Sequence, residues 1–206
     1  MDRGIRVTGS GTAVGPRDEC VITVGSEVRR PTAAAALDGS AAALEQMRAV
    51  FLAAGIAPES LTTSGVSLNP VYDEYPTVVG FQAAVRLTSS TSDIAAAGEL
   101  LSALVTAGGE AARVHEVSFR HADPSALVAR ARDAAWADAL ARATQLSGLA
   151  GRELGEVLGI EEVVGRDLAP GPVRMAMASG AGPARMSLDA GEGSVSVTLT
   201  VGWSLR

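Results

Sequence analysis

Residues 61–88, LTTSGVSLNPVYDEYPTVVGFQAAVRLT, contain two strand-like segments joined by a polar turn. Residues 61–71 and 78–88 are rich in residue types that strands favour, and residues 72–76, YDEYP, carry the turn signal. Two consecutive strands without a helix between them break the strict alternation of strand and helix that parallel α/β folds show. The stretch therefore favours an antiparallel or mixed sheet.

Helix signals occur three times outside this stretch. Residues 31–54 place large apolar side chains along one helical stripe, and a glycine follows as a stop. The members of that stripe are Leu37, Leu44, Met47 and Phe51. A second helix is predicted within residues 92–108, and a third starts at Asp123-Pro124 and continues to about residue 147, with Asp123 as its cap.

Further strands are predicted from alternating apolar residues, which gives the order ββαββαβαββ. These strands cover residues 5–13, 20–28, 114–120, 154–164 and 195–205. The prediction is an α+β fold with one mixed, mainly antiparallel sheet and three main helices packed on it. A single domain is expected over residues 5–205, with a long loop rich in Pro, Gly and Met at residues 165–193.

The composition allows a packed core and argues against several partners. Hydrophobic residues make up 47% of the 206, aromatic residues only 3%, and the net charge is −6. An acidic chain without a basic cluster is not expected to bind nucleic acid. The first residues lack a signal-peptide pattern, and no apolar run approaches the roughly 18 residues of a membrane span. The expected location is the cytoplasm, with no transmembrane segment.

Several segments together resemble the SIMPL domain family. They are residues 63–72 (TSGVSLNPVY), 80–83 (GFQA), 7–11 (VTGSG) and 174–177 (RMAM), and the final alternating strand. The resemblance covers about residues 5–205. It implies an α+β fold, self-assembly into large oligomers in at least some members, and no established enzyme activity. Bacterial members are linked to oxidative-stress defence or occur in the periplasm, and no catalytic residue is carried over from the family.

Two patterns that could indicate a ligand site are interpreted as structural. Gly9-x-Gly11-x-x-x-Gly15 superficially resembles a dinucleotide loop, but another strand follows it where that loop requires a helix. His115 and His121 stand six residues apart, about 20 Å along an extended strand, which is too far for one metal ion. No catalytic residue, cofactor or metal ion is predicted.

The single cysteine, Cys20, opens an apolar strand beside two acidic residues. A redox-sensing thiol requires exposure and a lowered pKa. The neighbouring carboxylates are expected to raise the pKa of Cys20, and it is interpreted as a small buried apolar residue. The carboxylate pair Asp73-Glu74 lies in the polar turn and is interpreted as solvated.

The third helix and the long loop supply candidates for an interface. On the helix, one apolar side comprises Leu127, Ala131, Ala134, Ala135, Leu146 and Leu149. Trp136 and Leu140 fall on nearly the opposite side and need another partner. Met175, Met177 and Met186 in the loop can fill an interface between subunits or pack on their own subunit, and both interpretations remain open.

The predicted function is that of a non-enzymatic protein that self-associates, as a structural or protein-interaction module with a role in stress tolerance. The alternative is a small-ligand binder or enzyme with a pocket between the turn at 72–80 and the loop at 165–193. A third reading is a cell-envelope binding protein. A homo-oligomer is the expected state, with another protein as a further partner.

Overall fold

The computed structural model describes residues 4–166 and 188–206. The three predicted Met interface candidates, Met175, Met177 and Met186, lie outside the described residues. The chain divides into two compact units. The first, here the terminal unit, contains the described residues of 1–17, 121–170 and 191–206; the second, the central unit, contains those of 18–120 and 171–190.

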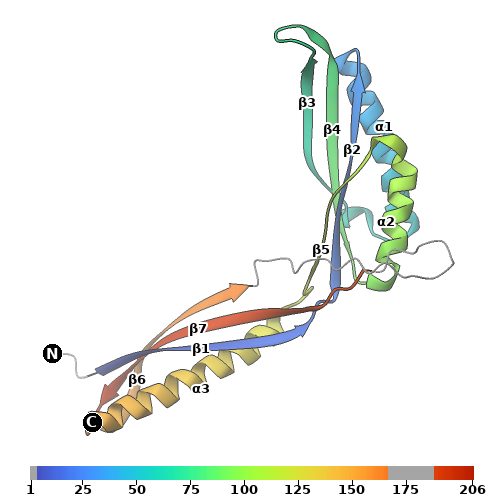
Figure 1. Cartoon of the computed structure of the whole chain (residues 1–206). Coiled ribbons are helices and arrows are strands. Elements are labelled where there is room, and N and C mark those ends of the chain that lie inside the picture. Colours follow the sequence, from blue (N-terminus) through green and yellow to red (C-terminus); the bar gives the residue numbers. More distant parts are fainter. Residues whose placement is uncertain (1–3, 167–187) are drawn as a thin grey trace, which may run out of the picture. The chain divides into compact units, whose positions relative to one another are not determined.

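The terminal unit is a three-stranded antiparallel sheet covered by one helix (Figure 1). The strand order is β1-β7-β6. Strand β1 spans Gly4–Pro16, β7 spans Glu192–Leu205 and β6 spans Leu154–Arg166. Helix α3, Ser125–Leu149, packs on β1 and β7. The two ends of the described chain thus lie side by side, with Gly4 opposite Ser204 and Pro16 opposite Glu192.

Close contact between α3 and β1 depends on small residues in both elements. A Cβ added to Gly9 would lie 2.3 Å from the Ala135 carbonyl oxygen, and one added to Gly11 would lie 2.2 Å from the Ala131 carbonyl oxygen. On the helix, the buried residues recur every four positions: Leu127, Ala131, Ala135, Ala139, Ala143 and Ser147. The glycines that superficially resemble a dinucleotide loop therefore serve the packing of a helix on a sheet.

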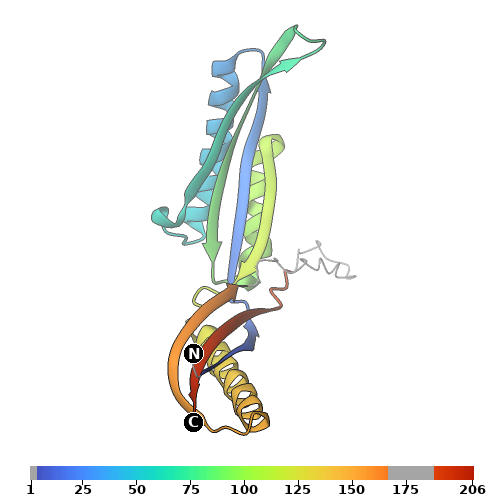
Figure 2. The ribbon, with the colours of Figure 1, turned by 90° about the vertical axis from the view of Figure 1, so that its left-hand side faces the viewer.

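The central unit is a four-stranded antiparallel sheet with two helices against one face (Figure 2). The strand order is β3-β4-β2-β5. These strands span Thr62–Tyr72, Val78–Thr91, Glu19–Arg30 and Ala112–Arg120, in that order. The helices are α1, Ala33–Ala53, and α2, Ile94–Gly108, and two short 3-10 turns lie at Pro58–Ser60 and Gly109–Ala111.

Alternation along the strands places the core of the central unit beneath α1 and α2. Ile22, Leu87, Met47, Phe51 and Leu104 are at most 1% exposed. Within this apolar region, the Ser26 hydroxyl donates to the Ser40 carbonyl oxygen at 2.8 Å. That bond satisfies a buried polar group between β2 and α1.

The predicted order ββαββαβαββ and the α+β class are confirmed, but the single sheet is wrong, because the seven strands form two sheets. Alternation identifies strands and their buried faces, whereas strand partners are chosen by contacts far apart in the sequence, such as Ile5 with Trp203. The assignment of one domain to residues 5–205 stays a prediction.

Two details of the third helix also differ from the prediction. Leu146 and Leu149 are 46% and 79% exposed, so the buried stripe, which is mostly alanine, excludes both leucines. The helix begins at Ser125, and Asp123 accepts hydrogen bonds from both the backbone N–H and the hydroxyl of Ser125 instead of capping the helix. These bonds lower the pKa of Asp123.

Candidate functional site

Strand β6 forms an edge of the terminal sheet and carries exposed apolar side chains. Its described backbone pairs with β7 alone, and residues 159–166 pair in unbroken register. The apolar side chains of this strand that are 41% to 68% exposed are Val157, Leu158, Ile160, Val163 and Val164. An edge of this kind is a template for pairing with another chain.

Helix α3 extends the apolar surface beside β6. Arg132, Trp136 and Leu140 follow at four-residue intervals and so share one side of the helix. The Arg132 guanidinium lies 2.8 Å from a carboxylate oxygen of Glu162 in β6, which places this side of α3 next to that strand. We name the surface formed by Trp136, Leu140, Val157, Ile160 and Val164 the β6–α3 patch.

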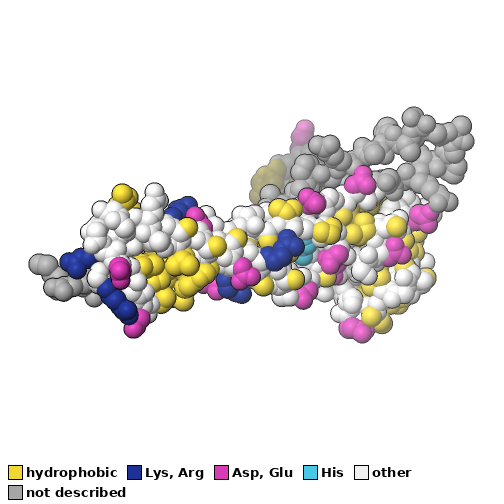
Figure 3. Space-filling view, turned by 90° about the horizontal axis from the view of Figure 1, so that it is seen from below, with side chains coloured by type: hydrophobic (Ala, Val, Ile, Leu, Met, Phe, Trp, Pro, Cys, Tyr) yellow, Lys and Arg dark blue, Asp and Glu magenta, His cyan; other side chains and the backbone are white. Residues whose placement is uncertain are grey.

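The two predicted interface residues on α3 have different surroundings. Trp136 is half-buried and packs against Trp203 of β7, with ring centroids 6.0 Å apart and an angle of 51° between the planes. Leu140 is 39% exposed. Trp136 therefore has a partner in its own unit, while much of the Leu140 side chain remains open. Hydrophobic side chains form a continuous area on the unit that carries the N-terminal strand (Figure 3).

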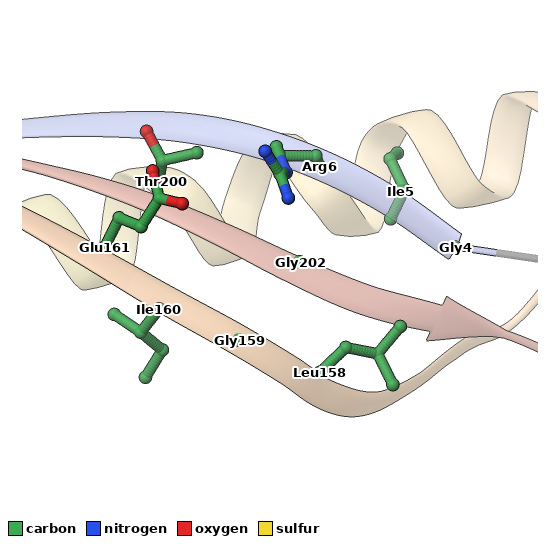
Figure 4. Close-up of a pocket in the computed structure, with 9 residues that line it drawn as sticks. All are labelled: Gly4, Ile5, Arg6, Leu158, Gly159, Ile160, Glu161, Thr200 and Gly202. Carbon is green, nitrogen blue, oxygen red and sulfur yellow. The ribbon is translucent and has the colours of Figure 1, made fainter. Parts of the chain in front are cut away.

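An open pocket of about 400 Å³ lies on the terminal sheet (Figure 4). All three strands contribute to its lining: Gly4, Ile5 and Arg6 from β1; Leu158, Gly159, Ile160 and Glu161 from β6; Thr200 and Gly202 from β7. Glycines form its floor, and a guanidinium and a carboxylate reach it from the two outer strands. The sequence prediction placed a pocket elsewhere, beside a loop that lies largely outside the described residues.

Comparison with known proteins identifies the family. The model of the SIMPL family, described as a protein of unknown function (DUF541), matches residues 5–203. The chain belongs to the SIMPL family. The resemblance noted in the sequence is thereby confirmed.

Two similar proteins are 26 kDa periplasmic immunogenic proteins, from Brucella melitensis and Brucella abortus. Each is 28% identical to this SIMPL chain over 184 residues, which cover 85% of the chain and 71% of the Brucella protein. Their names place them in the periplasm of their own cells, whereas a cytoplasmic location for this chain stays a prediction. None of the described helices has the length and apolar character of a membrane span.

A solved amidase of the hydantoinase/carbamoylase family from Burkholderia phymatum also matches part of this SIMPL chain. The match covers 56% of this chain and 31% of the amidase, at 20% identity and a TM-score of 0.25. A likeness at this level carries no argument about fold or activity.

The two histidines of this SIMPL protein have separate surroundings. His115 lies on β5 in the central unit, where burial and the nearby Arg86 charge lower its pKa and Glu27 opposes the shift. His121 belongs to the terminal unit, and a Cβ added to Gly193 would lie 2.7 Å from its Nε2 atom. Among the described residues, no group of three or more His, Cys, Asp and Glu side chains could hold a metal ion.

Cys20 lies in the core of the central unit and is 0% exposed. Burial raises the pKa of its thiol from the ordinary 9.0 to about 11. Desolvation is thus the cause, rather than the neighbouring carboxylates that the sequence suggested. The interpretation as a small buried apolar residue agrees with this position.

Cys20 is expected to react slowly with a thiol reagent such as Ellman's reagent while the protein is folded. At pH 8 a shift of two pKa units lowers the thiolate fraction about 100-fold, and burial blocks access as well. Labelling in urea gives the rate at which the thiol of the unfolded chain reacts, and Cys20→Ser gives the background signal without a thiol. Labelling of the native protein at a rate near that in urea would contradict a buried thiol, and a changed molar mass of Cys20→Ser would contradict a purely local role.

Proposed function

We propose that this SIMPL protein is a non-enzymatic structural or protein-interaction module that self-associates through the β6–α3 patch, with a role in stress tolerance. Burial of apolar surface between copies supplies the free energy of association, about 25 cal/mol per Å² removed from water. The open apolar edge of β6 is the observation that carries the proposal.

The other edge of the same sheet supports the choice of β6, because α3 side chains cover it. The outer edge of β1 is hydrogen-bonded at three points. The Asp138 carboxylate accepts from the Ser10 N–H, and the Arg142 and Arg130 guanidinium groups donate to the carbonyl oxygens of Thr8 and Val14. Within the described residues, the hydrogen bond from α3 to β6 joins the Arg132 and Glu162 side chains, and it leaves the backbone edge of β6 uncovered.

Both edges of the central sheet carry features that discourage strand pairing. Strand β3 has an irregular register between Thr63 and Val66, a Gly65 with φ of +126°, and Pro70 within the strand. Strand β5 has a register shift and several charged residues, including Arg113 and Glu116. Strand β6 also has register shifts on both sides of Val157, but the unbroken run of residues 159–166 is longer than any run in β3 or β5.

The test is the molar mass in solution, measured by light scattering coupled to size exclusion at micromolar and higher concentrations. The unmodified chain is expected to be an oligomer. Leu140→Lys and Val164→Lys each place a charge in the patch without touching the pocket, and each is expected to weaken association about tenfold or more, since an unpaired charge buried in an interface is costly.

Leu149→Lys is the matched control, because Leu149 is 79% exposed at the end of α3 and outside the patch. Its molar mass is expected to equal that of the unmodified chain. A monomeric unmodified chain would overturn self-association. If Val66→Lys, a substitution in β3, dissociates the oligomer while Val164→Lys leaves it intact, the interface lies on β3. That result would overturn the choice of β6.

A further inference from the structure

Two glycines in the terminal sheet, Gly159 beside a register shift in β6 and its partner Gly202, are not needed to avoid a collision with neighbouring atoms. Gly159 and Gly202 lie inside strands, where glycine is unfavourable, and neither has a positive φ. A Cβ added to Gly159 would meet nothing within 4 Å, and one added to Gly202 would meet only ordinary contacts at 3.9 and 4.0 Å. Gly9, by contrast, is required by α3. Glycine within a strand also occurs where a ligand approaches the backbone closely.

Opposite charges stand on the two sides of these glycines. Arg6 in β1 pairs with Gly202, and Glu161 in β6 pairs with Thr200, so both side chains project from the face of the sheet opposite α3. Figure 4 shows the two side chains extending over β7 from its two neighbouring strands. In the part of the chain that the structure describes, no hydrogen bond or ion pair joins Arg6 or Glu161 to another residue. Both are available to a ligand.

An apolar wall completes the pocket. Leu158 reaches from β6 across β7, since its Cδ1 atom lies 3.2 Å from the Cβ position of Gly4 on β1. Ile160 borders the same pocket, but it pairs with the buried Val201, so its side chain projects from the α3 face and Leu158 alone forms this wall. The Thr200 hydroxyl lies 3.1 Å from that of Thr8, so one further polar group stands between the charges. A cationic end, an anionic end and an apolar wall thus surround a backbone floor.

We propose that this pocket binds a small zwitterion, a free amino acid or dipeptide with an apolar side chain. The ligand carboxylate bonds to the Arg6 guanidinium, its ammonium group bonds to Glu161, and its side chain packs against Leu158 above Gly202. Charge-assisted bonds of this kind are the strong polar contacts of ligand sites. A volume of about 400 Å³ lies in the range of small-molecule pockets. The inference does not rest on the proposed self-association.

Isothermal titration calorimetry of the full chain with glycyl-leucine tests the proposal. Saturable binding is expected. N-acetyl-glycyl-leucine lacks the ammonium group and glycyl-leucinamide lacks the carboxylate, so each is expected to bind about tenfold more weakly or worse. Arg6→Gln removes the partner of the ligand carboxylate, and Glu161→Gln removes the charge that pairs with the ligand ammonium group. Each variant is expected to weaken glycyl-leucine binding as much as the corresponding peptide change does. Their melting temperatures are expected to stay unchanged, because neither residue has a partner to lose.

Gly202→Val distinguishes a loss of ligand binding from a loss of folding stability. Its side chain would fill the pocket floor, so binding is expected to be lost, while a β-branched residue in the strand is expected to raise the melting temperature by about 2–4 °C. Thr198→Val places the same side chain on the same face of β7 outside the pocket, and it is expected to bind glycyl-leucine as the unmodified chain does.

Three results would overturn the proposal. The first is no saturable heat with glycyl-leucine up to ~10 mM, the weak limit of a specific site. The second is equal binding of the acetylated and amidated peptides, which would remove the zwitterion as the ligand class. The third is unchanged binding by both Gly202→Val and Arg6→Gln, which would place the peptide elsewhere on the chain.

Discussion

Gly11→Val is expected to disrupt the terminal unit. A Cβ at this position would lie 2.2 Å from the Ala131 carbonyl oxygen and 2.4 Å from the Ala135 nitrogen, so the backbone of α3 itself blocks the side chain. The helix has to lift from β1 and expose its alanine stripe. Overpacking commonly costs about 1–3 kcal/mol, and a collision with two backbone atoms places this substitution at about 3 kcal/mol or more.

Tryptophan fluorescence during urea unfolding measures this loss, because both tryptophans of the chain, Trp136 and Trp203, lie in the terminal unit. The midpoint of the fluorescence transition is expected to fall sharply for Gly11→Val. Ser10→Val is the control, since Ser10 is the adjacent residue on the exposed face of β1. Equal midpoints for the two variants would show that the helix does not lie as close to β1 as the geometry states.

The α3–β1 contact also shows what the sequence could and could not reveal. Helical periodicity correctly predicted α3, yet it assigned the buried side partly to Leu146 and Leu149, because large apolar residues are the usual core formers. Over residues 131–143 the helix lies so close to the sheet that its buried residues there are all alanine. The sequence signal for this close approach is the combination of small residues in both elements: Ala131, Ala135 and Ala139 in the helix, and Gly9 and Gly11 in the strand.

The local sequence pattern could not predict which strands pair with each other. The order of elements followed from alternation and turn residues, but nothing local indicates that β1 pairs with β7 at the other end of the chain, or that β2 joins a different sheet. These partners depend on contacts between residues far apart in the sequence. Adjacent strands therefore led to the incorrect expectation of one sheet.

The candidate sites were predictable in part. Leu140 was found because it is an apolar residue on the side of α3 away from the main stripe, and the structure leaves it 39% exposed. The pocket was missed because its charges, Arg6 and Glu161, are brought together only by the pairing of β1 and β6 with β7. The signal that could have indicated it is the occurrence of Gly159 and Gly202 inside strands.

Phe51→Ala is expected to have the largest effect in the central unit. Phe51 is 0% exposed and is one of the largest fully buried side chains of that unit's core, between α1 and the sheet. Removing a buried phenylalanine side chain costs about 3–5 kcal/mol, from lost apolar burial and the cavity that remains. Leu52→Ala is the matched control, because Leu52 follows directly on α1 and is 40% exposed, so its loss is expected to stay near or below about 1 kcal/mol.

Hydrogen exchange followed by mass spectrometry locates the effect of Phe51→Ala. The buried clusters of the two units share no residue, one being built around Val197, Val201 and Trp203 and the other around Phe51 and Leu87. Exchange is therefore expected to accelerate in α1 and α2 far more than in α3 and β7. Equal acceleration in all four elements would mean that the two cores open as one cooperative unit, and the energetic separation inferred from their composition would be wrong.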